Sequence, residues 1–193
     1  MPTGVHIQDA RAQLFDAAER VLLREGPHAL TSRAVTTEAG VAKGVLHRHF
    51  PDFDGFLTEL VLDRIARLPS LGPEPGVGEI VDNLTEFLSA VFTSVAVSIV
   101  ALITFRDDLR RRLRAVRGPG VPLASEAGAL LRQYLRDERE LGRLAADADI
   151  DTVAPTLIGA GHLIFADRES GPPSEDAVRR MVRTVLAGAT TDR

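Results

Sequence analysis

The stretch LTSRAVTTEAGVAKGVLHRHF, residues 30–50, ends in a crowded basic run. The side chains of His47, Arg48 and His49 can hydrogen-bond to base edges or to phosphates. Lys43, together with the backbone amides at the start of the same predicted helix, suits a phosphate group. These residue types and their spacing predict contact with a nucleic acid. Because the whole chain has a net charge of −4, we expect a local site and not a general coating of nucleic acid.

Other chemistries fit the sequence poorly. On a helix, residues i and i+2 point to different faces, so His47 and His49 cannot share one metal ion within a subunit. The alternating acids Asp147, Asp149 and Asp151 lack the longer ligand set and the closing glutamate of a calcium loop. The sequence has no phosphate loop, no nucleophile elbow and no pair of carboxylates in an apolar setting. We therefore predict no catalytic residue, no metal and no cofactor.

The composition is that of a folded intracellular protein. Hydrophobic residues make up 45% of the chain and charged residues 26%, which is the range of ordinary globular proteins. The chain has no cysteine, so disulfides and thiolate metal sites are excluded, and a reducing compartment is favoured. The N-terminus lacks a basic segment followed by an apolar core, so we expect no secretory signal and a cytoplasmic location.

Helices must position the basic run, since helical periodicity dominates the chain and no convincing strand pattern occurs. Apolar spacing predicts a first helix over residues 9–25 and a third over about 42–49. Between them, Thr31 or Ser32 can cap a short second helix, and Gly40 supplies the left-handed turn that ends it. Two short helices joined by a tight glycine turn and braced by a third form a helix-turn-helix.

The remainder of the chain is also predicted to be helical. Pro51 ends the third helix, and apolar spacing predicts a fourth over residues 53–68. The segment PSLGPEPGVG, residues 69–78, indicates a loop between a small N-terminal unit and a larger part. Apolar helical stretches are expected at about 79–106, followed by a basic amphipathic helix at 107–117 and further helices to the C-terminus.

The segment RAVTTEAGVAKGVLHRHFPDFDGFLTELV, residues 33–61, resembles the DNA-binding segment of the TetR family of bacterial transcriptional regulators. The resemblance covers about residues 10–65. It implies that Lys43 and Gly44 contact phosphate and that the second helix begins against the DNA backbone. The predicted DNA-binding residues are Thr31, Ser32, Arg33, Ala42, Lys43, Gly44, Val45, His47, Arg48 and His49.

Two features depart from the family pattern. The usual tyrosine is His47 here, and the acidic sequence DFD, residues 52–54, stands where a basic residue often follows the Phe-Pro step. Both departures predict a weaker grip on phosphate than the family pattern implies.

The resemblance implies an all-α fold and a homodimeric regulator. We expect an N-terminal three-helix helix-turn-helix DNA-binding domain over residues 1–52. A larger helical ligand-binding and dimerisation domain would occupy residues 53–193, with helix 53–68 connecting the two. The implied partners are a palindromic double-stranded DNA operator, a second copy of the chain and a small, lipophilic effector. Binding of the effector would change the conformation of helix 53–68, and this change would release the repressor from DNA.

Two further sets of residues are predicted in the larger domain. Aromatic residues there are expected in the core, and they are also the candidates for lining an effector pocket. These ligand-binding candidates are Phe87, Phe92, Phe105, Tyr134, His162 and Phe165. The last two helices carry apolar faces that would form a four-helix bundle with a partner. The predicted dimer residues are Leu157, Ile158, Gly161, Phe165, Val178, Met181, Val182, Val185 and Leu186.

Two alternative functions remain open at this point. Residues 87–105 contain no charge and approach the ~20 apolar residues of a membrane span, which would suit a membrane-associated helical protein. Against this, serine and threonine interrupt the run and no Trp or Tyr flanks it. A helical small-molecule carrier without DNA binding is the second alternative. The arginines of helix 107–117 are expected to form a solvated face with local ion pairs, or else to place Arg110, Arg111 or Arg114 near DNA.

Overall fold

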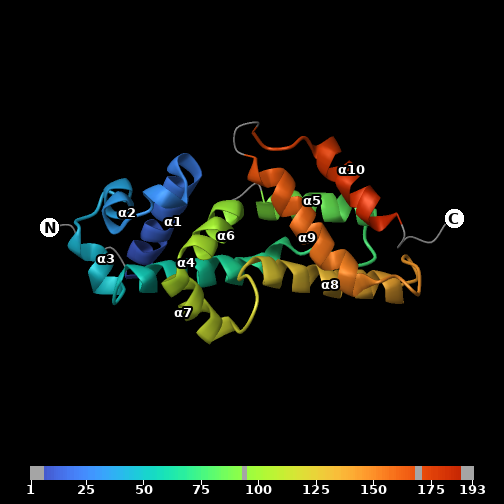
Figure 1. The fold of residues 1–193 in the computed structure, drawn as a ribbon, viewed down its shortest axis with the longest axis horizontal. Helices are drawn as coiled ribbons and strands as arrows, with labels where there is room; N and C mark the ends of the chain where they lie inside the picture. The colour runs from blue at the N-terminus through green and yellow to red at the C-terminus, as the bar shows by residue number, and fades with distance from the viewer. Residues whose placement is uncertain (1–6, 93–94, 168–170, 188–193) are drawn as a thin grey trace. The chain divides into compact units, whose positions relative to one another are not determined.

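The computed structural model describes residues 7–92, 95–167 and 171–187, and every regular element within these ranges is a helix (Figure 1). The predicted all-α fold class is confirmed. The described residues form two compact units, which we treat separately. Unit 1 comprises residues up to 64 together with 98–122, and unit 2 comprises residues 65–97 and 123 onwards.

Unit 1 contains the N-terminal helices and a later helical segment. Its elements are α1 (Ile7–Glu25), the short 3-10 helix η1 (Pro27–Ala29), α2 (Ser32–Glu38), α3 (Gly44–His49), most of α4 (Phe53–Arg67), most of α6 (Ala96–Phe105) and α7 (Asp107–Arg117). The sequence predicted the larger domain to begin at residue 53, whereas most of α4 and residues 98–122 cluster here with the N-terminal helices.

Aromatic rings form the centre of unit 1. Phe15 on α1 lies 5.8 Å from Phe50 and 5.6 Å from Phe56, measured between ring centroids, and Phe50 meets Phe56 edge to face at 5.0 Å. All three side chains are buried. Edge-to-face and tilted pairs of this kind add to the stabilisation that burial already provides. The end of α3 and the start of α4 are therefore fixed against α1.

Charge complementarity attaches residues 98–122 to the rest of unit 1. Arg106 lies 2.7 Å from the Asp54 carboxylate, and Arg112 lies 2.8 Å from that of Asp52. The hydroxyl of Ser98 donates to the Leu22 carbonyl at 3.5 Å. The basic helix predicted over 107–117 forms as α7 with the same bounds.

Unit 2 contains η2 (Leu68–Leu71), α5 (Ile80–Phe92), α8 (Ala124–Glu140), α9 (Ile150–Ala166) and α10 (Glu175–Leu186). Within it, α9 packs on α8, α5 and α10, and α10 also packs on α5. Gly161 permits the close approach of α9 to α5, since a Cβ atom there would lie 2.8 Å from the Phe92 ring.

A buried polar network holds the segment before α5 against α8. The fully buried carboxylate of Glu138 accepts a hydrogen bond from the Gly76 amide at 3.0 Å and lies 3.1 Å from Arg143 Nε. The Asn83 side-chain amide donates to the Tyr134 hydroxyl at 3.0 Å. Since buried polar groups are costly unless paired, these bonds fix the loop that the sequence predicted at 69–78.

The apolar run at 87–105 is broken into two helices, α5 and α6. No single helix in the described residues is both long and apolar enough to cross a membrane. These two helices meet the length and composition of a span only when they are joined across their break, which includes residues 93–94.

Candidate nucleic-acid interface

The helix-turn-helix is formed by α2, a glycine turn and α3. Thr31 caps α2, because its Oγ1 accepts a hydrogen bond from the Ala34 amide at 3.1 Å. Gly40 adopts a φ of 67° at the other end, where its amide donates to the Thr37 carbonyl and the next amide, of Val41, donates to Thr36. This is the Schellman arrangement, which needs a left-handed residue at the position of Gly40. The turn predicted at Gly40 is confirmed.

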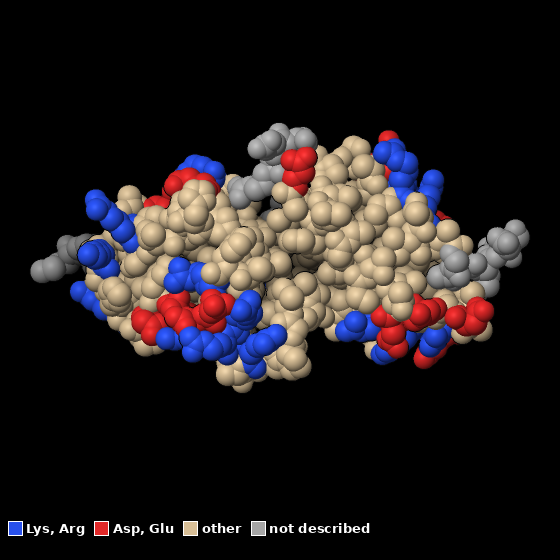
Figure 2. Space-filling model, in the orientation of Figure 1, with Lys and Arg blue, Asp and Glu red and all other residues tan. Residues whose placement is uncertain are grey.

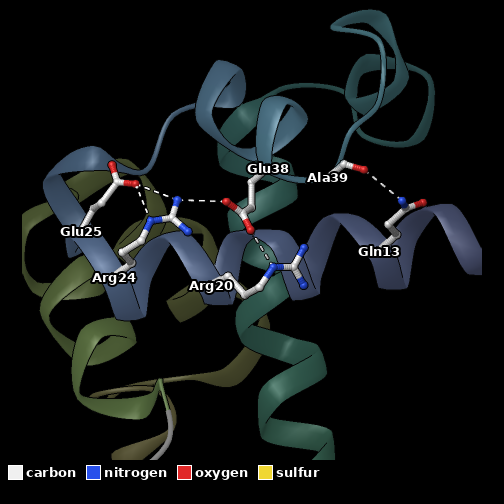
Figure 3. A network of polar contacts seen from close by, with 6 residues as sticks. All are labelled: Gln13, Arg20, Arg24, Glu25, Glu38 and Ala39. Carbon is white, nitrogen blue, oxygen red and sulfur yellow. Dashed lines mark hydrogen bonds and ion pairs between the residues drawn. The ribbon is translucent and has the colours of Figure 1, made fainter.

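Three side chains of α1 hold the C-terminal end of α2 (Figure 3). Arg20 Nε lies 2.7 Å from one carboxylate oxygen of Glu38, and Arg24 Nη2 lies 2.9 Å from the other. Gln13 donates to the Ala39 carbonyl at 2.9 Å. The hydrogen bonds from Arg20 and then Arg24 lower the pKa of Glu38. The turn before α3 therefore has a fixed position on α1.

One face of α3 is buried and the other is open. Leu46 and the residue after the helix, Phe50, are buried in unit 1. The predicted DNA-binding residues lie on the remaining surface of α2, the turn and α3. Thr31, Arg33, Ala42, Lys43, Gly44, His47 and Arg48 are exposed, whereas Ser32, Val45 and His49 are half-buried. The fold thus brings these residues onto short, neighbouring elements that project basic groups.

Gly44 has no evident role within the protein. A Cβ atom built there would have no described atom within 4 Å, and its φ lies outside the left-handed region, unlike that of Gly40. Neither packing nor backbone conformation therefore requires glycine at the first residue of α3. The small size of Gly44 does allow another molecule to approach the backbone amides that open this helix.

The acidic residues 52–54 are compensated by arginines that the sequence did not pair with them. Asp52 Oδ1 accepts from the Gly55 amide at 2.6 Å, while Oδ2 lies 2.8 Å from Arg112. The hydrogen bonds from Arg112 and Gly55 lower the pKa of Asp52. Asp54 is paired with Arg106. The negative charges of Asp52 and Asp54 are therefore balanced by arginines within unit 1.

The α7 arginines are largely engaged by acids. Arg110 lies 2.5 Å from Asp107, and Arg111 pairs with Asp108. Figure 2 shows basic and acidic side chains intermingled where α7 lies. This matches the expectation of a solvated face with local ion pairs.

The predicted effector residues divide between the units. In unit 2, the Phe92 ring centroid lies 6.0 Å from that of His162 and 5.9 Å from that of Phe165. Phe87 and Tyr134 are also buried there. Phe105 belongs to unit 1 and is 83% exposed, so it does not share this core. Burial lowers the pKa of His162, whose Nδ1 has no hydrogen-bond partner among the described residues.

A cavity of about 700 Å³ in unit 2 has a more polar lining than the sequence predicted. Phe165 is the one predicted effector residue that it contacts, and Arg179 at its edge pairs with Asp82 and Glu175. The lining residues are Asp82, Thr85, Glu86, Ser89, Ala90, Phe165, Pro172, Pro173, Glu175 and Arg179. The polar members lie on α5 and α10 at positions that range from exposed, as for Glu86, to buried, as for Thr85, so no common sequence pattern marks them.

Most of the predicted dimer residues pack inside unit 2. Their apolar stripes face α5, α8 and each other, because the same periodicity that suits a partner also suits the core of one subunit. Leu157, Ile158, Gly161, Phe165, Val178, Val182 and Leu186 are buried, and Met181 and Val185 are half-buried. The outward face of α9 instead carries Thr156, Gly159 and Leu163, the last being 74% exposed.

Within the described ranges, no three His, Asp or Glu side chains are grouped so that they could hold a metal ion.

Residues 14–60 match the family model described as bacterial regulatory proteins, tetR family. No curated protein sequence matches the chain. Solved structures resemble nearly its whole length. Escherichia coli NemR in its reduced form has a TM-score of 0.73 at 20% identity, over 95% of this chain and 98% of that one. The fatty acid degradation regulator FadR from Bacillus halodurans has a TM-score of 0.69 at 18% identity, over 93% and 95%.

A TetR-family transcriptional regulator from Haemophilus influenzae RD has a TM-score of 0.62 at 14% identity, over 95% of this chain and 98% of that one. At these identities the likenesses show a common fold. The described residues contain ten α-helices, and their fold is shared with these solved structures.

Proposed function

We propose that the chain is a homodimeric cytoplasmic repressor of the TetR family that binds a palindromic operator and is released by a small molecule. The match of residues 14–60 to the family model supports this proposal. The observation that carries DNA binding is the open face of α3. Lys43 and Arg48 are exposed there beside Gly44, whose backbone is accessible and whose lack of a side chain serves no internal contact. These groups suit phosphate and the edges of bases in a major groove.

Two-fold symmetry sets the form of the operator. A symmetric dimer presents two α3 helices separated by about one DNA turn, roughly 34 Å, or a multiple of it. The operator should therefore consist of two inverted half-sites. Since phosphate contacts release counterions, binding should weaken steeply as salt rises.

The experiment is a selection of genomic fragments with the purified protein, followed by binding isotherms on the best fragment at several salt concentrations. We expect an inverted-repeat site. Lys43→Ala should weaken binding and reduce the salt slope by about one, as expected for one lost phosphate contact. Arg136→Ala removes an exposed, paired arginine of unit 2, and it should change neither the operator affinity nor the salt slope.

The opposite result identifies the alternative. If a folded dimer enriches no fragment at low salt, DNA binding is refuted and the helical carrier without an operator becomes the better account. A protein found in the membrane fraction, and released by detergent but not by salt, would instead favour the membrane-associated alternative. Repression is tested by a reporter placed behind the selected operator, whose expression should rise when the gene for this protein is deleted.

Dimerisation is supported by the outward face of α9. Its exposed or half-buried residues Gly159, Ala160 and Leu163 are small or apolar, and the α9 residues between Thr152 and Ala166 carry no charge. Small residues let helices approach closely, and an exposed leucine in such a stripe gains by burial against a second copy.

The effector site that we propose is the cavity lined by α5, Phe165, α10 and the segment before it. Its volume lies in the usual range for small-molecule sites. Phe165 and Ala90 offer apolar contacts, whereas Glu86 is an exposed carboxylate without an ion pair among the described residues. An effector with an apolar body and one positive charge fits this lining. A thermal-shift screen of such compounds should find hits that Glu86→Gln weakens, and hits unaffected by this change would place the site elsewhere.

A further inference from the structure

Arg11 on α1 connects three helices of unit 1 through one guanidinium group. Its Nη1 donates to the carbonyl of His49, the last residue of α3, at 3.2 Å. Its Nη2 forms an ion pair with Glu59 on α4. The guanidinium carbon also lies 4.5 Å from the centroid of the Phe50 ring, so the group covers the residue that follows α3. The side chain of Arg11 is two-thirds buried by these contacts.

The position of α3 depends on such contacts because the helix is short. It has six residues, and a helix of that length has no independent stability in water. Its last carbonyls lack partners within the helix and carry the negative end of its dipole. Arg11 supplies both a donor and a positive charge at this end. Leu46 and Phe50 fix the buried side of α3, but apolar contacts restrict its rotation less than a directed hydrogen bond does.

Glu59 orients the guanidinium of Arg11 towards the His49 carbonyl. An arginine held by a carboxylate on one side and by a carbonyl on the other loses most of its rotational freedom, and the planar guanidinium suits two such acceptors. The chain α4–Glu59–Arg11–His49 therefore ties the C-terminal end of α3 to α4 by polar contacts.

We propose that Arg11 is a positioning residue for DNA recognition: bridged to Glu59, it holds the end of α3 at the angle at which Lys43, His47 and Arg48 meet the operator. This rests on the proposed function. Arg11 lies outside residues 14–60, which match the regulatory family, and outside the predicted DNA-binding residues. The competing explanation is that Arg11 itself contacts a phosphate.

The direction in which Glu59→Gln changes operator affinity separates the two explanations. Glu59→Gln removes a negative charge and leaves Arg11 in place. If Arg11 contacts phosphate, loss of the nearby carboxylate should strengthen DNA binding or leave it unchanged. If Arg11 acts by holding α3, the neutral amide holds the guanidinium less firmly and operator binding should weaken.

The experiment measures operator affinity, affinity for unrelated DNA and hydrogen exchange of the amides of residues 46–50, in the full-length protein. Arg11→Met keeps an apolar stem over Phe50 and removes the donors. We expect about a tenfold loss of operator affinity, the size expected when a charge-assisted hydrogen bond is lost. Binding to unrelated DNA should change by less than about twofold, because no phosphate contact is lost. Exchange at the end of α3 should accelerate.

Arg64→Met is the matched control. It removes another arginine–glutamate pair between α1 and α4, in which Arg64 lies 3.7 Å from Glu19. It should leave operator affinity and exchange at residues 46–50 at wild-type values.

Two results overturn the proposal. One is wild-type operator affinity and wild-type exchange of α3 in Arg11→Met. The other is operator binding by Glu59→Gln that is as tight as that of the wild-type protein or tighter, which assigns Arg11 to a phosphate. If Arg11→Met does not fold, Glu59→Gln alone decides between the outcomes. If the wild-type protein selects no operator, the proposed function fails, and the exchange measurement still decides whether Arg11 and Glu59 hold α3.

Discussion

In unit 1, the guanidinium of Arg112 lies 2.8 Å from the carboxylate of Asp52, which also accepts the Gly55 amide at the start of α4. The acid stands two residues beyond Phe50, the residue that follows α3. It would oppose a phosphate backbone if it were uncompensated, and Arg112 removes that opposition. An acidic residue can therefore lie beside the helix that we propose to bind DNA.

Arg112→Gln should weaken operator binding, because it leaves the negative charge of Asp52 without its partner. The loss should be largest at low salt and should shrink as salt rises, since the effect acts through a screened Coulomb interaction. Binding isotherms at several salt concentrations measure it. Adding Asp52→Asn, which keeps a capping side chain, should restore affinity in the double variant. A double variant as weak as Arg112→Gln would mean that Arg112 contacts DNA itself.

Gly44 and Gly40 should respond in opposite ways to alanine. Gly44→Ala should stabilise the protein by about 0.5–1 kcal/mol, because alanine replaces glycine in a helix with open space around it. It should also reduce operator affinity by obstructing the backbone. Gly40→Ala should destabilise by about 1–2 kcal/mol, since φ is 67° there. Urea unfolding and operator binding of both variants check this, and unchanged operator affinity in Gly44→Ala would count against close approach of a phosphate.

Glu38 should stabilise unit 1 in a pH-dependent way. Folding lowers its pKa below the usual value of 4.5 through hydrogen bonds from Arg20 and Arg24. The contribution is therefore fully present above pH 4.5 and is lost as pH falls through the lowered pKa. Wild-type protein should be more stable than Glu38→Gln at pH 7, and the difference should diminish below pH 4.5.

The chain has one tyrosine, Tyr134, so its titration can be measured without interference from other tyrosines. The pKa of Tyr134 is raised to about 12, chiefly by burial and also by the neighbouring Glu138, while the hydrogen bond from Asn83 acts in the opposite direction. Tyrosinate absorbance should therefore titrate near pH 12 in the folded protein, without interference from tryptophan, which the chain lacks.

The free energy of unfolding should change over the pH range in which Tyr134 titrates. Because the pKa of Tyr134 is raised on folding, its contribution is intact below pH 10.0 and is lost as pH rises towards about 12. Glu138→Gln should lower the pKa of Tyr134 by removing the nearby charge. An unshifted tyrosine titration in wild-type protein would contradict the buried network.

Leu163 should be central to the dimer. Leu163→Glu places a charge on the outward face of α9, and burying it against a second copy would cost more than the contact gains. Sedimentation should show a monomer with much weaker operator binding. Leu141→Glu alters another leucine of unit 2 that is 57% exposed, and it should remain dimeric. A dimeric Leu163→Glu protein would assign the interface to a different surface.

Local signals in the sequence predicted the elements of unit 1 well. The first helix was predicted over 9–25 and spans Ile7–Glu25, and the fourth was predicted over 53–68 and spans Phe53–Arg67. Capping by Thr31 and the turn at Gly40 depend on neighbouring residues, so the sequence contains their cause.

Contacts between distant residues could not be predicted. Asp52 and Arg112 are 60 positions apart, and nothing in either segment specifies the other. The apolar stripes of Leu157 and Val178 were assigned to a partner, yet both residues are buried within their own subunit. Periodicity identifies an apolar face but does not say which surface covers it. For the same reason Phe105 was grouped with aromatic residues of unit 2, although it is exposed in unit 1.

The close packing of Gly161 on Phe92 limits which amino-acid substitutions the sequence can accept during evolution. A side chain at position 161 would lie 2.8 Å from the Phe92 ring and 3.4 Å from Leu88, so α9 could not keep its distance from α5. Descendants of this sequence that acquire alanine at 161 should therefore also carry a smaller residue at 92 or 88. Substitutions on α5 and α9 would then occur together. Phe92, whose ring neighbours His162, would be replaced whenever Gly161 is replaced.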